Sequence, residues 1–292
     1  CLIFTSHIFM KHLKIFIDLT RLNKPIGFLL LFWPCSWGLT YAYGFDKNLN
    51  TYLYYLLLFF LGSILMRSAG CIFNDIVDKD FDKKVKRTKL RPIPSGKISV
   101  KLSMIYVLIL CLISFLILIQ FNLKTIYLGL GSMILAFSYP YMKRITYWPQ
   151  LFLGLTFNWG LVMAYTSILD QLSIEVFLLY LSAIFWTLGY DTIYGVQDIV
   201  DDEIIGVKST AIKFKGNIKF FVGICYLITF LLIIFIFKNN IGVNFSSFFI
   251  FMFSLSLIYQ IKIFNDNPVN CLKAFKINNF SGIFMFITIF FS

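Results

Sequence analysis

The sequence TYLYYLLLFFLGSILMRSAGCIFNDIVDKDFD, residues 51–82, joins a long apolar run to a cluster of acidic residues. The apolar part is long enough to cross the hydrocarbon core of a bilayer as a helix. The last nine residues contain four aspartates. Carboxylates are costly to remove from water at a membrane boundary. The segment therefore indicates a membrane helix that ends in a polar site.

The rest of the chain has the same character. Apolar residues make up 59% of the 292 positions and charged residues 14%, whereas a globular domain carries about a quarter charged residues. We therefore expect an all-α integral membrane protein, with residues 1–292 forming one membrane domain. The apolar runs predict nine transmembrane helices. Their expected ranges are 26–45, 51–78, 100–120, 124–141, 149–168, 173–196, 217–237, 242–261 and 276–291.

The basic residues predict the orientation of these helices. Of 26 Lys and Arg residues, 22 lie in segments on one side, and only Lys47, Lys124 and Lys238 lie on the other. The positive-inside rule places the richer side, including an N-terminal tail at residues 1–18, in the cytoplasm. The net charge of +12 thus reflects loops between spans and not a nucleic-acid-binding face. We expect a bacterial cytoplasmic (inner) membrane, with the mitochondrial inner membrane as the alternative.

A second acidic segment, YDTIYGVQDIVDDE at residues 190–203, ends the sixth expected helix. The two segments hold nine of the fourteen acidic residues, and the orientation places both on the cytoplasmic side. At about 100° per residue, Asp191, Asp198 and Asp202 lie on one helical face. A straight helix would separate Asp191 from Asp202 by about 16 Å. We therefore expect Asp198 and Asp202 to act together, with Asp191 deeper in the membrane.

The same angles sort the first motif. Asp75, Asp78 and Asp82 lie within about 60° of one another, with Asn74 beside them, whereas Asp80 points about 140° away from Asp75. The alternative interpretation is a solvated helix end. Carboxylates on one stripe at a membrane boundary repel one another, however, and a divalent cation relieves that repulsion.

Oxygen ligands alone suit Mg²⁺, which retains water and bridges to phosphates. Both histidines lie in the N-terminal tail, so no histidine metal site is expected in the membrane. A lipid diphosphate would need a metal at its head and an apolar cavity for its tail. The expected metal ligands are Asp75, Asp78, Asp82, Asp198 and Asp202.

These motifs resemble those of the UbiA-type intramembrane prenyltransferases. NDIVDKDFD is similar to the family's NDxxDxxxD motif, and DIVDD is similar to its second motif, DxxxD. The segments at residues 21–34 (RLNKPIGFLLLFWP) and 190–210 resemble the 4-hydroxybenzoate polyprenyltransferase branch. The resemblance implies nine helices around a central cavity that opens laterally to lipid. It also implies Mg²⁺-dependent transfer of a polyprenyl group to the ring carbon ortho to the phenol of 4-hydroxybenzoate, in ubiquinone biosynthesis.

The resemblance assigns roles to acidic and basic residues in turn. The expected catalytic residues are Asp75, Asp78, Asp191 and Asp198. Substrate binding is expected of Arg21, Arg67, Asn74, Arg87, Arg91, Tyr139, Lys143, Arg144 and Lys208.

Two of these basic residues compete for one role. Arg21 is expected to pair with the carboxylate of the acceptor, and Arg67 is its main competitor. Arg67 lies within a span and needs a partner, either a motif aspartate or a substrate anion. Lys143 and Arg144 are candidates for the diphosphate or, equally, anchors of the positive-inside kind.

Two alternative functions share some of these sequence features. A sibling prenyltransferase would use homogentisate, dihydroxynaphthoate or a tetrapyrrole as acceptor. An ion-coupled transporter also carries intramembrane acids, but its path needs charged groups at both faces of the membrane. Here the acids cluster at one face. We expect the lipid bilayer and the two substrates as partners, with no obligatory protein partner.

Overall fold

The computed structural model describes residues 2–85 and 87–292. No β-strand occurs in these two ranges. The helices, in chain order, are α1 (Leu2–Thr20), α2 (Ile26–Asp46), α3 (Leu49–Val77), α4 (Lys79–Asp82), α5 (Val100–Leu118), α6 (Leu123–Ile145), α7 (Pro149–Leu169), α8 (Ile174–Gly195), α9 (Ile199–Ile205), α10 (Thr210–Lys213), α11 (Ile218–Ile236), α12 (Phe245–Ile263) and α13 (Pro268–Phe290), with 3₁₀ turns η1 (Val196–Asp198) and η2 (Lys238–Asn240).

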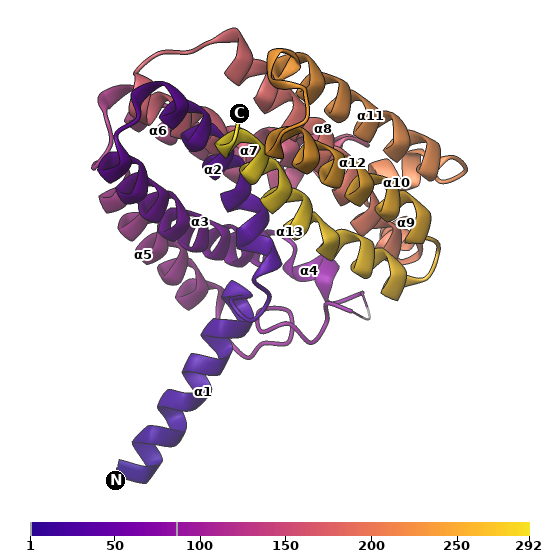
Figure 1. Ribbon diagram of the computed structural model, residues 1–292. Helices are drawn as coiled ribbons and strands as arrows, with labels where there is room; N and C mark the ends of the chain where they lie inside the picture. The colour runs from indigo at the N-terminus through magenta and orange to yellow at the C-terminus, as the bar shows by residue number, and fades with distance from the viewer. Residues whose placement is uncertain (1, 86) are drawn as a thin grey trace.

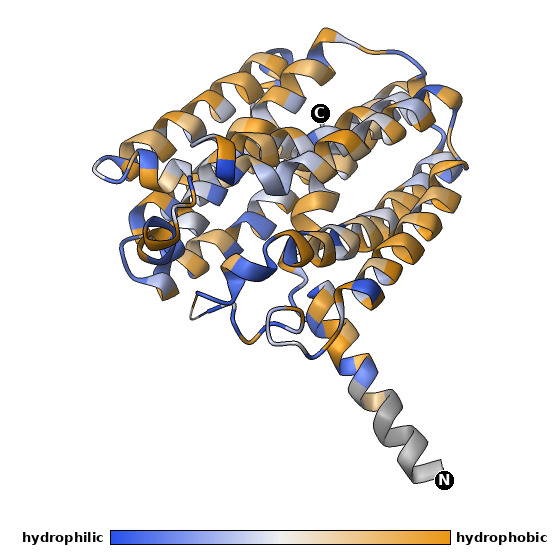
Figure 2. Cartoon of the chain, turned by 180° about the vertical axis from the view of Figure 1, so that it is seen from behind, coloured by the Kyte–Doolittle hydropathy of each residue, from blue (hydrophilic) through white to orange (hydrophobic). Residues whose placement is uncertain are grey.

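Each of the nine predicted ranges coincides with one long helix of the bundle (Figure 1). Six segments are long and apolar enough to cross a membrane by length and composition alone. They are Leu49–Val77, Val100–Leu118, Pro149–Leu169, Ile174–Ile205, Ile218–Ile236 and Phe245–Ile263. The predicted count of nine spans is therefore not confirmed in full by this criterion. Figure 2 shows why the chain is a multi-pass membrane protein, since apolar residues dominate the long helices and hydrophilic residues gather in the connections.

The largest error in the predicted boundaries concerns α13. The helix begins at Pro268, whereas the prediction placed its start at residue 276. The prediction missed the first turns because Lys273 and Lys276 are typical of a loop. The Asn267 side chain accepts a hydrogen bond from the backbone N–H of Val269, and proline suits the first turn of a helix. Local capping chemistry thus starts a helix where hydropathy does not.

Capping by Ser or Asn side chains recurs along the chain. An N-cap side chain satisfies a backbone N–H that the helix itself cannot bond. The residues that do so at the starts of α3, α5, α6, α8 and α12 are Asn48, Ser99, Asn122, Ser173 and Asn244.

The predicted tail contains a further helix. The α1 helix extends away from the bundle at the end where α4 lies (Figure 1). It ends at a tight turn in which Arg21 adopts a left-handed conformation with φ 55°. The C-terminus lies at the opposite end of the bundle (Figure 1). The cytoplasmic location of the tail stays a prediction.

The helix pairs repeat in order along the chain. The α2 helix packs against α3, which packs against α5, and α7 packs against α8, which packs against α11. The first helices of the two sets, α2 and α7, pack extensively against each other. The acidic motif falls at the end of the second helix of each set. The two sets thus form a quasi-repeat that brings the two motifs to one end of the bundle.

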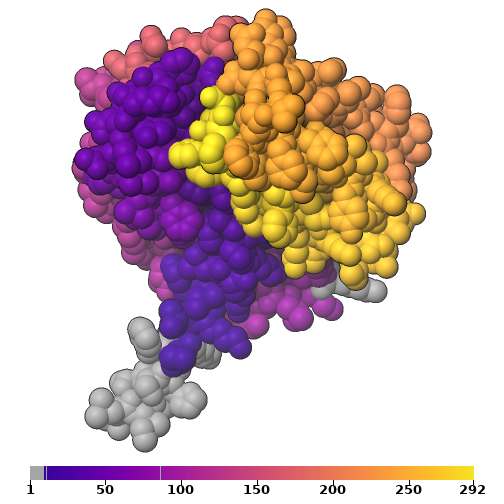
Figure 3. All heavy atoms as spheres, in the orientation of Figure 1, coloured from indigo at the N-terminus to yellow at the C-terminus, as the bar shows by residue number. Residues whose placement is uncertain are grey.

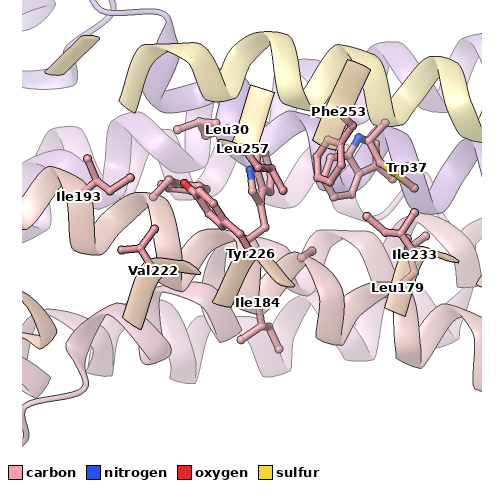
Figure 4. Packing of buried hydrophobic residues seen from close by; sticks show 14 of the residues in the cluster. Leu30, Trp37, Leu179, Ile184, Ile193, Val222, Tyr226, Ile233, Phe253 and Leu257 are labelled. Atoms are coloured by element: carbon pink, nitrogen blue, oxygen red, sulfur yellow. The ribbon is translucent and has the colours of Figure 1, made fainter. Parts of the chain in front are cut away.

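The second half of the bundle holds the main apolar core. Figure 4 shows Tyr226 and Val222 of α11 beside Ile184 and Ile193 of α8, with Leu257 of α12 above them. Most polar groups within this core are paired, as lipid-embedded helices require, although the buried Tyr190 hydroxyl has no described partner. Gln260, Asn278 and Trp186, for example, form a continuous hydrogen-bonded chain.

The close approach of α2 to α7 gives a test of the packing. A Cβ atom on Gly38 would lie 2.1 Å from the Leu161 carbonyl oxygen, which is backbone and cannot rotate away. Gly38→Ala should therefore force the helices apart and cost about 1–3 kcal/mol. Gly44→Ala, on the same helix with no atom within 4 Å, is the control. Thermal unfolding in detergent measures both, and equal Tm values would contradict the packing.

Candidate active site

The first acidic motif wraps around the end of α3. The helix ends at Val77, Asp78 caps it, and the short α4 continues to Asp82. Asp75, Asp78 and Asp82 are buried, whereas the Asp80 side chain is 86% exposed and contacts only Lys83 at 3.2 Å among charged groups. The burial pattern agrees with the predicted angles, although the helix is interrupted at Asp78.

Arginines from two connections neutralise Asp75. Its Oδ1 atom lies 2.5 Å from Arg21, which follows α1, and 3.1 Å from Arg91, which follows α4. Arg91 also contacts Asp82 at 2.9 Å. Because the left-handed turn at Arg21 ends α1, the backbone there directs this guanidinium toward α3. The three-part ion pair fixes both connections to the end of α3.

Asp78 is paired with the end of α6. Lys143 donates a hydrogen bond to Asp78 Oδ2, and Arg144 lies 3.6 Å from Oδ1. The buried Oδ1 atom accepts no hydrogen bond from a described group. Burial raises the pKa of the Asp78 carboxyl above its usual range, and the Lys143 ammonium opposes that rise. Asp78 Oδ1 is therefore a carboxylate oxygen that can still bind a cation.

The second acidic motif departs from the predicted straight helix. The α8 helix ends at Gly195, the η1 turn follows, and α9 begins at Ile199. Asp198, at this break, accepts two hydrogen bonds from Arg87 at 2.9 and 2.7 Å. The assumption of an unbroken helix from Asp191 to Asp202 is therefore wrong, although Asp191, Asp198 and Asp202 all line the same cavity. Arg87 instead joins the connection after α4 to the second motif.

One large cavity of about 1390 Å³ connects both motifs. Most of the predicted site residues lie on its wall. Those residues are Arg21, Arg67, Asn74, Asp78, Asp82, Arg87, Arg91, Tyr139, Lys143, Asp191, Asp198, Asp202 and Lys208. Asp75, an expected metal ligand, and Arg144, an expected substrate-binding residue, do not line the cavity, whereas Asn74 beside Asp75 does. Asp75 faces its arginines, and Arg144 stacks on Phe81 and donates to the Val77 carbonyl oxygen.

The first of the two partners expected for Arg67, a motif aspartate, is not found among the described residues, and the second, a substrate anion, stays a prediction. Arg67 forms no ion pair with any described residue, and its guanidinium lies 5.2 Å from the centre of the Phe157 ring. Arg21, by contrast, is held by Asp75. Arg67 is thus one of the cations on the cavity wall, with Lys24, Lys208 and Lys276, that form no ion pair with a described residue.

The wall also contains polar residues that the sequence analysis did not assign to the site, among them Tyr194, Gln150 and Lys276. Tyr194 was open to prediction, because it lies three residues after Asp191 and four before Asp198 and so shares their helical face. Its hydroxyl accepts a hydrogen bond from Arg87 at 3.4 Å. Gln150 and Lys276 reach the cavity through the packing of α7 and α13, which local spacing does not reveal.

The donor atoms suit a hard cation, but no three His, Cys, Asp or Glu side chains among the described residues are grouped closely enough to form a metal centre. The basic side chains instead occupy the carboxylates. Asn74, Asp78, Asp82, Asp198 and Asp202 nevertheless offer oxygen donors on one cavity wall, and Asp78 Oδ1 is unsatisfied. These features fit Mg²⁺, which prefers oxygen ligands.

The sequence profile described as the UbiA prenyltransferase family matches residues 31–288. The chain belongs to this family. A 4-hydroxybenzoate octaprenyltransferase from Blochmanniella pennsylvanica is 40% identical to this UbiA-family chain over 283 residues, which cover 96% of each protein.

Solved UbiA homologues share the fold. The apo structure from Aeropyrum pernix K1 matches with a TM-score of 0.74 at 20% identity, covering 88% of this chain and 94% of its own. A homologue from Archaeoglobus fulgidus, bound to GPP and Mg²⁺, gives a TM-score of 0.70 at 19% identity, covering 94% and 99%. The all-helical architecture expected from the sequence is therefore confirmed.

The ion pairs of this UbiA-family site predict unequal roles for two nearby aspartates. Asp75→Ala leaves two arginines without their shared partner, and removing one side of a buried pair costs on the order of 3 kcal/mol. Asp80→Ala removes only an exposed contact and should leave Tm almost unchanged. Both variants are compared by thermal unfolding in chelator, so that metal binding does not contribute. A matching loss at Asp80 would refute the assignment.

Proposed function

We propose that this protein transfers a polyprenyl group from a Mg²⁺-bound polyprenyl diphosphate to the ring carbon ortho to the phenol of 4-hydroxybenzoate. The observation that carries the proposal is one cavity whose carboxylates come from two helix ends and whose other walls are apolar. The curated relative described above supports the acceptor. We assign the reaction to ubiquinone biosynthesis, as the sequence resemblance implies. The bacterial relative supports a location in the bacterial inner membrane, and the distribution of basic residues supports a cytoplasmic N-terminus.

The head of the donor is assigned to the motif end of the cavity. Asn74, Asp78, Asp82, Asp198 and Asp202 would hold Mg²⁺, a set supported by their shared wall and by the Mg²⁺-bound homologue. Bound there, the metal neutralises the diphosphate and makes it a better leaving group.

The basic residues that now neutralise the aspartates are assigned to the diphosphate. Arg87, Arg91 and Lys143 lie on the cavity wall, and each also contacts a motif carboxylate. When those carboxylates bind a cation, the same side chains are free to donate hydrogen bonds to phosphate oxygens. Lys208 is nearby, with its ammonium group on the Ile145 carbonyl oxygen.

The proposed reaction requires cavity walls that exclude water. The allylic C–O bond breaks and its electron pair leaves with the diphosphate, and the ring carbon then forms the new C–C bond. Water would intercept the allylic cation, so apolar walls are required. Aromatic faces such as Tyr139 and Phe157 stabilise positive charge. Asp191, which has no described ion pair, is assigned to accept the proton that the ring carbon loses.

Product analysis tests the reaction. Membranes containing the protein, supplied with 4-hydroxybenzoate, octaprenyl diphosphate and Mg²⁺, should yield octaprenylated hydroxybenzoate by mass spectrometry. EDTA should abolish the product and Mg²⁺ should restore it, because the carboxylates need a cation before they can hold a diphosphate. Formation of the product in the presence of EDTA would contradict the mechanism. If product formed only with homogentisate or dihydroxynaphthoate, the protein would be a sibling prenyltransferase with that acceptor.

Arg67 is assigned to the acceptor carboxylate in place of Arg21. Arg67→Ala should raise the KM for 4-hydroxybenzoate by a factor equivalent to about 1.5–3 kcal/mol, the range for a hydrogen bond to a charged group. The KM for the diphosphate should stay nearly constant, and Arg67→Lys should recover part of the loss. Arg21→Ala should lower Tm instead, since it breaks the pair with Asp75. If only Arg21→Ala raised the acceptor KM, the original expectation would stand.

A further inference from the structure

The guanidinium of Arg67 contacts two helices other than its own. Arg67 belongs to α3, and its side chain reaches Gly27 in the first turn of α2, where a Cβ atom would lie 2.9 Å from Nε, 3.5 Å from Nη2 and 3.6 Å from Cζ. The Phe157 ring of α7 has its centre 5.2 Å from Cζ. Since Arg67 forms no ion pair with a residue that the structure describes, these two contacts determine where its guanidinium lies.

The backbone conformation does not explain the glycine at position 27. Among the described glycines, a positive φ occurs at Gly96 and Gly206, whereas Gly27 lies within α2 and is not one of them. Inside a helix, glycine is less favourable than alanine because it loses more backbone freedom on folding. The atoms that a Cβ at Gly27 would meet all belong to Arg67. We therefore attribute the glycine to the space that the guanidinium occupies.

Neighbouring helices hold α2 in place. The α13 helix lies along α2 (Figures 1 and 3). Trp33 of α2 donates a hydrogen bond to Asn279 of α13 at 3.0 Å, and Trp37 donates to a backbone carbonyl oxygen of α13 at 3.0 Å. The α2 helix also packs extensively against α7. A side chain added at Gly27 would therefore displace the flexible Arg67 side chain and not the backbone of α2.

A guanidinium that is positioned in advance binds a carboxylate more readily than a mobile one. An arginine side chain has many rotamers, and a ligand that binds it must restrict that freedom. The planar guanidinium donates to both oxygens of a carboxylate only in a narrow range of orientations. Gly27, Arg67 and Phe157 all line the cavity, beside Tyr139 and Asp191. Contacts with α2 and α7 thus order Arg67 before an acceptor arrives.

We propose that Gly27 is a positioning residue that favours carboxylated acceptors by fixing Arg67 beside Phe157. The inference rests on the function proposed above, in which Arg67 binds the carboxylate of the acceptor. Gly27 acts through Arg67 and needs no contact of its own with the substrate. Its contribution is the absence of a Cβ atom, which leaves room for the guanidinium where α2, α3 and α7 meet.

Gly27→Ala tests the inference directly. The displaced Arg67 should raise the KM for 4-hydroxybenzoate about three- to tenfold, because a binding group must be held within about 0.5 Å of its productive position. The kcat and the KM for octaprenyl diphosphate should change less than about twofold, since only acceptor binding is affected. Tm should stay constant or rise, because alanine favours a helix more than glycine does. Gly44→Ala is the control, since Gly44 lies on the same helix with no atom within 4 Å of the added Cβ.

A double-mutant cycle separates positioning of Arg67 from general damage to the site. If Gly27 acts only through Arg67, adding Gly27→Ala to Arg67→Ala should lower the kcat/KM for 4-hydroxybenzoate no further. Phe157→Leu provides a second variant, which keeps an apolar side chain but removes the ring beside the guanidinium. It should raise the acceptor KM about two- to fivefold, the scale of an interaction between a cation and an aromatic ring. That rise should also vanish in the Arg67→Ala background.

The outcomes separate the role of Gly27 from the reaction itself. A wild-type acceptor KM in Gly27→Ala would overturn the inference, as would an undiminished effect of Gly27→Ala in the Arg67→Ala background. Wild-type protein that prenylates no hydroxybenzoate would refute the proposed function instead. In that case, calorimetric titration in detergent compares the binding of 4-hydroxybenzoate with that of its neutral amide, 4-hydroxybenzamide. Weaker binding of the benzoate but not of the amide in Gly27→Ala would support the positioning of Arg67, and any other pattern would overturn it.

Discussion

Carboxylates buried at the end of a membrane helix require positive charge within contact distance, and this requirement organises the polar end of the molecule. Asp75 holds Arg21 and Arg91, Asp78 holds Lys143, and Asp198 holds Arg87. Each pair connects segments that are distant in sequence. Desolvation makes an unpaired buried charge far more costly than the pair. The connections around the site are therefore positioned by the same aspartates that the proposed chemistry uses.

The division of carboxylates between two quasi-equivalent helix sets has a chemical result. Neither motif alone surrounds the cavity, because one ends α3 and the other follows α8. The contact between Arg87 and Asp198 links the connection after α4 to the second motif, with the Tyr194 hydroxyl beside it. A diphosphate between the motifs would engage both halves of the bundle, so ligand binding and the packing of α2 against α7 support each other.

Much of this was accessible from the sequence, and the failures have specific causes. Apolar runs located nine helices to within a few residues, except at α13, where Pro268 starts a helix that Lys273 and Lys276 disguise. Helical angles separated the buried Asp82 from the exposed Asp80. The unbroken helix assumed for the second motif is wrong after Gly195, because the η1 turn interrupts it, yet Asp191, Asp198 and Asp202 still line one cavity. Which arginine meets which carboxylate depends on tertiary packing, and no local pattern encodes it.

The apolar part of the cavity wall has a consequence for affinity. A lipid tail that enters this cavity leaves acyl chains and not water, and acyl chains are as apolar as the leucines on the wall. Transfer from bilayer to protein therefore gains little from the hydrophobic effect, however long the tail. Discrimination between a polyprenyl diphosphate and the surrounding lipids falls to the charged head, where a few ionic contacts outweigh the whole length of hydrocarbon.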